Sequence, residues 1–178
     1  MKNATIVVLS ILVMLLALNV NSVAFAGGDN TARSLSELET EMREIAISFC
    51  KFAIMFADDA EARNKAAKEL LALVKKHPKL AVANTEAIGV LGMKTKRIDV
   101  LVQEIRDFTV SLEFRLKAGK IPAGSDLADI SARVREVEST RKEINQLAEL
   151  LFISSRPLPF GRRSFQLSFN LVFVKIKA

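Results

Sequence analysis

Cysteine and histidine are nearly absent from this chain of 178 residues, which contains one of each. The single cysteine, Cys50, has no partner for an internal disulfide, and there is no C-x-x-C-H motif for covalent haem attachment and no second thiolate for a metal site. Cys50 lies in an apolar helical stretch, where we expect a small buried hydrophobic residue. The single histidine, His77, rules out a zinc site built from clustered histidines.

Glycine is also scarce, with seven residues, and no glycine-rich phosphate loop is present. No sequence feature sets a nucleophile beside a base or a pair of carboxylates in a cleft, so we expect no enzymatic activity. Residues 27–151 contain 20 basic and 20 acidic residues, and the net charge of +6 comes from Lys2 and from five basic residues in 152–178. A neutral body lacks the basic face that nucleic-acid binding needs.

The N-terminus has the form of a secretory signal. A weakly basic start precedes an apolar run from Ile6 to Leu18, and Ala24-Phe25-Ala26 has the small residues that signal peptidase recognises. The alternative is an uncleaved anchor helix, but a run of 13 residues is shorter than the stretch that spans a bilayer. We therefore predict cleavage after Ala26, removal of residues 1–26 and a periplasmic location.

Four segments have apolar residues at steps of three and four, the spacing of amphipathic helices. Capping boxes mark the first two starts, Pro78 ends the second segment, and Gly119 with Pro122 follows the third. Because the connections are short, we predict an all-α fold, an antiparallel up-down-up-down four-helix bundle over residues 27–151. The predicted helices are 34–56, 58–77, 85–117 and 125–151. Gly89 and Gly92 weaken the first turns of the third helix, so a start near Met93 is the alternative.

Each predicted helix has one apolar stripe that we expect to face the core. Arg141 interrupts the stripe of the fourth helix at a position where an apolar residue is expected. The residues expected to face inward are Leu35, Leu38, Met42, Ile45, Phe49, Phe52 and Phe56; Ala62, Ala66, Leu70, Leu73 and Val74; Ile88, Leu91, Ile98, Leu101, Ile105, Phe108 and Leu112; and Leu127, Ile130, Val134, Val137, Ile144, Ala148 and Leu151.

The C-terminal tail, 152–178, differs from the body in composition and pattern. It is basic and rich in phenylalanine, and residues 164–173 alternate between polar and apolar, as in a strand. Nothing else in the sequence predicts a partner strand. Three interpretations stay open: the tail packs onto the bundle, it pairs with another protein or a membrane surface, or it is the product of a shifted reading frame.

Six stretches of the chain have a distinctive order and spacing: SELETEMREI (36–45), FADDAEARNKAAKEL (56–70), HPKL (77–80), RIDVLVQEIRD (97–107), AGKI (118–121) and STRKEINQ (139–146). In these stretches the chain resembles the soluble cytochrome b562 family, over residues 34–150. The resemblance implies an up-down bundle that holds one non-covalent haem b near one end; the family is itself a known example of this topology. It also implies a periplasmic electron carrier with an unidentified redox partner protein.

By position, the resemblance places the axial methionine ligand of the iron at Met42 and the family's axial histidine at Asn145. At about 1.5 Å per residue, the two side chains would face each other at one depth of the predicted bundle. An amide is a poorer ligand for haem iron than an imidazole, so we expect impaired or altered ligation. The alternative for Met42 is an ordinary core residue. His77 is either a substitute ligand or a surface residue at a helix end.

The remaining residues of the predicted haem site would contact the porphyrin. Arg141 would face a propionate, or else extend its charged end to solvent at the edge of the bundle. Two functions therefore remain: an electron-transfer haem protein with weakened ligation, and a haem-free periplasmic bundle that acts as a structural or protein-interaction module. The predicted apolar contacts are Leu38, Ile45, Ile144 and Ala148.

Overall fold

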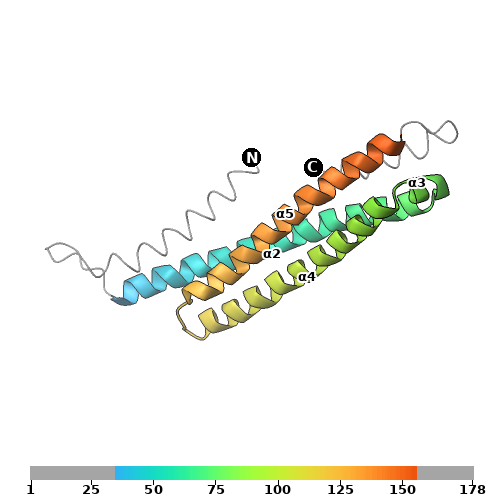
Figure 1. Cartoon of the computed structure of the whole chain (residues 1–178). Coiled ribbons are helices and arrows are strands. Elements are labelled where there is room, and N and C mark those ends of the chain that lie inside the picture. The colour runs from blue at the N-terminus through green and yellow to red at the C-terminus, as the bar shows by residue number, and fades with distance from the viewer. Residues whose placement is uncertain (1–34, 156–178) are drawn as a thin grey trace, which may run out of the picture. The chain divides into compact units, whose positions relative to one another are not determined.

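The structure, a computed structural model, describes residues 35–155, which form helices joined by short non-helical segments (Figure 1). The described residues contain no strand, which confirms the predicted all-α class and is consistent with a helical bundle. The predicted signal peptide lies outside these residues, as does the tail from residue 156 onward. The helices are α2 (Leu35–Lys75), α3 (Pro78–Ala83), α4 (Thr85–Lys117) and α5 (Gly124–Ser155).

Two of the predicted helices are confirmed. α4 has the predicted bounds of 85 and 117, and α5 begins one residue early and extends four residues beyond Leu151. All seven apolar residues predicted to face inward on α5 are buried. On α4 two of the seven predicted residues are not buried: Ile88 is half-buried, and Phe108 is 37% exposed because Thr109 takes the core-facing position.

The structure corrects the prediction for the N-terminal half: no turn separates 34–56 from 58–77, because α2 continues as one helix of 41 residues. Asp58 and Asp59 have the local pattern of a helix start, but no glycine or proline interrupts residues 35–75. Ala57 and Ala60, both fully buried, favour helix and continue the core stripe. Three long helices and the six-residue α3 therefore replace the four long helices of the up-down-up-down prediction.

The buried stripe of α2 is made largely of alanine. Its steps alternate between four and three residues as far as Ala67, which keeps the stripe on one side of the helix. Most of the larger residues predicted to face inward flank this stripe and are only half-buried, among them Met42 and Phe56, while Ala62 is exposed. The buried residues on this stripe are Ala46, Cys50, Ala53, Ala57, Ala60, Asn64, Ala67, Leu70 and Val74.

The helices contribute to two compact units. The first contains residues 35–53 and 107–132, and the second contains residues 54–106 and 133–155. Each unit therefore has parts of α2, α4 and α5, and α3 belongs to the second. Within residues 35–155, none of the helices combines the length and the apolar character that crossing a membrane requires.

In the first unit, the end of α4 is closed as the sequence predicts. Gly119 has a φ of 79°, a conformation that glycine adopts more readily than residues with a side chain. Its N–H donates to the carbonyl of Leu116 at 3.0 Å, and the N–H of Lys120 donates to the carbonyl of Arg115 at 3.0 Å. These two bonds form a Schellman motif, which satisfies carbonyls that the helix end would leave free.

Asp126 holds the start of α5 against the end of α4. Its carboxylate accepts the backbone N–H of Ala123 at 3.0 Å and pairs with Arg115 at 2.7 Å. Burial alone would raise the pKa of Asp126, but the bonds from Arg115 and Ala123 and the charge of Arg115 lower it below its usual range. The charged carboxylate is therefore favoured in the folded chain.

We expect Asp126→Asn to lower the free energy of unfolding by about 1 kcal/mol at neutral pH, the usual value of a helix-capping interaction. A carboxyl with a lowered pKa stabilises the folded state above its ordinary pKa, and this stabilisation is lost as the pH falls through the folded-state pKa. The difference in the free energy of unfolding between Asp126→Asn and the unmodified chain should therefore shrink below about pH 4. Urea unfolding at several pH values would measure this difference. Exposed Asp129 supplies the control, Asp129→Asn; a difference that did not change with pH would contradict the assignment.

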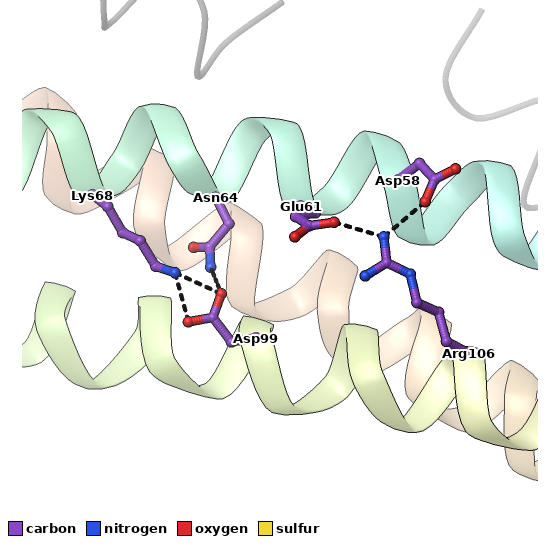
Figure 2. A network of polar contacts seen from close by, with 6 residues as sticks. All are labelled: Asp58, Glu61, Asn64, Lys68, Asp99 and Arg106. Atoms are coloured by element: carbon purple, nitrogen blue, oxygen red, sulfur yellow. Dashed lines mark hydrogen bonds and ion pairs between the residues drawn. The ribbon is translucent and has the colours of Figure 1, made fainter.

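In the second unit, polar contacts align α2 with α4 (Figure 2). Arg106 of α4 reaches Asp58 at 2.8 Å and Glu61 at 2.6 Å, both on α2. Seven residues after Glu61 on α2, Lys68 pairs with Asp99 at 2.6 Å. Residue numbers rise along α2 as they fall along α4, so these two segments run in opposite directions.

Further ion pairs join α4 to α5 in the same unit: Arg133 with Glu104 at 2.9 Å, Arg97 with Glu136 at 2.7 Å and Lys94 with Glu143 at 2.7 Å. Partly exposed pairs of this kind contribute about 0–1 kcal/mol each, so they set alignment more than stability. The stability comes mainly from apolar burial, at roughly 1.5–3 kcal/mol for each fully buried large side chain. The fully buried residues of α4 in this unit are Leu91, Ile98, Leu101 and Ile105.

Candidate functional site

A small pocket in the second unit brings together polar side chains of α2 and α5. The space that it encloses is about 10 Å³, room for one water molecule. Four of its seven lining residues are polar or charged, which is unusual for the side of a helix that faces the core. The lining residues are Arg63, Asn64 and Ala67 of α2, Ile98 of α4, and Arg141, Ile144 and Asn145 of α5.

Two guanidinium groups at this pocket share one carboxylate. The Nε of Arg63 donates to both oxygens of Asp59 at 2.8 and 2.9 Å. Nη1 of Arg141 lies 3.7 Å from Oδ2 of the same aspartate. Burial lowers the pKa of the Arg141 guanidinium below its ordinary value, the nearby charge of Arg63 lowers it further, and Asp59 and Glu138 oppose the change. Positive charge is therefore concentrated on one side of the pocket.

Asn64 is the polar core residue of this site, with 4% of its surface exposed. Its amide nitrogen donates to the carbonyl of Thr95 and to Oδ1 of Asp99, both at 2.8 Å (Figure 2). Its Oδ1 is buried without a hydrogen-bond partner, and so is Nη1 of Arg63. A buried asparagine can fix the register of packed helices, so Asn64 helps to align α2 with α4.

The structure places only some of the predicted haem-site residues together. Arg141, Ile144 and Asn145 line the pocket, and Ala148 is buried one turn later on α5. His77 is the residue before α3, where its backbone carbonyl accepts the N–H of Ala81 at 2.9 Å. The other three predicted residues are half-buried on the part of α2 that belongs to the first unit: Leu38, Met42 and Ile45.

The residues around Asn145 do not fit a haem. A pocket for a large cofactor needs several hundred Å³, about 300–1,000 Å³, whereas the space beside Asn145 is about 10 Å³. Met42 does not line it and lies 21 positions before Arg63 on the continuous helix α2. Met42 and Asn145 would lie at one depth only if a turn near Ala57 separated two helices, and α2 contains no such turn. The ligand pair therefore stays a prediction without structural support.

Arg63 and Asn64 are the pocket residues that the sequence argument missed. The signal was present, because Asn64 continues the stripe of small buried residues through Ala57 and Ala60 at steps of three and four. A polar side chain on a core stripe marks a buried polar contact. Interpreting 34–56 and 58–77 as separate helices hid this continuity.

Cys50 is buried in the first unit, as the sequence predicts. Burial raises the pKa of its thiol to about 11, and the charge of Glu113 acts in the same direction. Its Sγ lies 4.0 Å from the carbonyl oxygen of Thr109. A thiol with this pKa stays protonated at neutral pH and is a poor nucleophile.

Among residues 35–155, no group of three or more His, Cys, Asp or Glu side chains is placed to hold a metal ion. Comparison with known proteins adds no family: no family model, no curated protein and no solved structure matches this chain.

Proposed function

We propose that this chain is a haem-free periplasmic helical module that acts by binding another protein. This is the second of the two functions that the sequence leaves open. It is favoured over the electron carrier because the space at Asn145 is far smaller than a haem. The observation that carries the proposal is an exposed apolar surface in the first unit.

This surface lies at the end of α4 and on the following loop, and we call it the α4-end patch. Val110 is 61% exposed, Phe114 is 74% exposed and Ile121 is 45% exposed. Positions 110 and 114 are one helical turn apart and therefore share a face. Exposed Lys117 and Lys120 follow Phe114 in the sequence, and Lys117 pairs with Glu113 at 3.6 Å. Exposed apolar side chains beside charged ones are typical of protein-binding surfaces, so the partner fits if it presents an apolar face flanked by carboxylates.

Site-specific photocrosslinking tests the patch. With Phe114 replaced by photoreactive benzoylphenylalanine, we expect crosslinks in cells to an apolar peptide of another protein that carries neighbouring acidic residues. The same probe at exposed Ala128 in α5 is the matched control and should give none of this product. Reversing the charges of Lys117 and Lys120 to Glu should lower the yield. A product made only with a second copy of this chain, or equally from position 128, would contradict the proposal.

Haemin titration tests the absence of the cofactor. For the chain from Gly27, we expect the reduced visible spectrum to lack the sharp bands of iron with two axial protein ligands. Asn145→His should not change this, because an added imidazole leaves the pocket too small for a porphyrin. A gain of tenfold or more in haem affinity on this substitution, about 1.4 kcal/mol, would instead restore the electron-carrier function.

A further inference from the structure

We propose that the pocket between α2 and α5 is a binding site for a single small monovalent anion, with chloride as the occupant that its size favours. This site lies in the second unit and is separate from the α4-end patch. It goes beyond the proposed function, because a bound anion would join two helices rather than recruit a partner.

Charge is the first argument. Arg63 and Arg141 approach the same oxygen of Asp59, at 2.8 and 3.7 Å, and that aspartate is itself 46% exposed. Glu138 is the other acidic group near Arg141, but burial raises its pKa, against the charges of Arg141 and Lys142. Glu138 does not line the pocket, and among the described residues no ion pair joins it to Arg141. Among the described residues, the ion pairs of Arg63 and Arg141 reach Asp59 alone, so two positive charges meet one negative charge there.

Hydrogen-bonding capacity is the second argument. Nη1 of Arg63 is buried with no acceptor. Among the described residues, Arg141 makes the long ion pair to Asp59 and no shorter hydrogen bond. A guanidinium group has five N–H donors, and Asn145 adds an amide on the same pocket. Oδ1 of Asn64 is buried without a partner, but this one acceptor does not match the number of donors, so the pocket favours an occupant that accepts hydrogen bonds.

Size is the third argument and selects the occupant. A space of about 10 Å³ holds one atom-sized particle, such as a water molecule. A chloride ion is a single atom, carries the complementary charge and accepts several hydrogen bonds. Sulfate and phosphate are too large without displacement of the arginines. Water would satisfy both the donors and Oδ1 of Asn64, but it would leave the charge of the two guanidinium groups unchanged.

Nuclear magnetic resonance of the folded chain tests this site. Chloride is titrated at constant ionic strength against sodium sulfate, and the arginine Nε–H and asparagine amide signals are followed. We expect a saturable shift of the signals of Arg63, Asn64 and Asn145. Removing a charge-assisted hydrogen bond by Arg141→Gln should raise the apparent Kd for chloride about tenfold or more.

The matched control is Arg135→Gln, which removes the same charge from an exposed position on α5 and should leave the Kd for chloride within about twofold. Circular dichroism verifies that each variant folds, and Arg63→Gln replaces Arg141→Gln if the latter does not. A shift that grows linearly without saturation would show that chloride does not bind at a specific site, and an equal Kd in Arg141→Gln would place the bound chloride elsewhere; either result would overturn the proposal. Saturation by acetate but not by chloride would overturn the single-atom occupant.

Discussion

Ala57→Pro should destabilise the chain by about 3 kcal/mol or more, the cost of proline inside a helix. Ala57 is fully buried in the interior of α2, 22 residues after its first residue. Proline at this position removes the hydrogen bond from residue 57 to the carbonyl of Ala53, and its ring collides with that carbonyl. Urea unfolding followed by circular dichroism at 222 nm would measure the loss.

This result would distinguish the continuous helix from the turn that the sequence pattern predicts. In a turn between 56 and 58, residue 57 precedes a helix start, where proline is well tolerated. Stability close to that of the unmodified chain would therefore contradict the continuous α2. The control is Ala57→Gly, which keeps the backbone N–H and should cost about 1 kcal/mol.

The fold was predictable where local signals and core packing agree. For 85–117, the closing glycine and the apolar stripe indicate the same helix, and α4 has these bounds. At Asp58 they disagree. The two aspartates satisfy the local pattern of a helix start, but buried Ala57 and Ala60 continue a stripe that only an unbroken helix keeps on one side. Local capping signals contribute about 1 kcal/mol, which is less than the packing of a whole helix face.

The candidate site was predictable in part for the same reason. Arg141 was noted because a cation interrupts an apolar stripe, and it is indeed a pocket residue. Its counterpart Arg63 lies outside the stripe of α2, so nothing in the spacing marks it. Which charges on α2 meet Arg141 depends on how α2 and α5 are aligned. That alignment follows from the continuity of α2, which the sequence argument did not predict.

Side-chain size misled the assignment of the core on α4 as well. Phe108 was predicted to face inward because it is large and apolar, whereas smaller Thr109 is 1% exposed. Apart from Leu101, the buried positions of α4 from Leu91 to Leu116 follow alternate steps of four and three, and Thr109 fits this series. Periodicity over the whole helix is therefore a better guide to burial than the hydrophobicity of single residues.

Leu112→Ala should consequently be far more damaging than Phe114→Ala, although phenylalanine is the larger side chain. Leu112 is 1% exposed in the first unit, so its truncation leaves a cavity and should cost about 2–5 kcal/mol. Phe114 is 74% exposed on the α4-end patch, so its truncation should change stability by about 0.5 kcal/mol or less. Urea unfolding of both variants measures the difference. A large loss from Phe114→Ala would mean that this side chain is packed within the free chain, and the patch would then be unavailable to a partner.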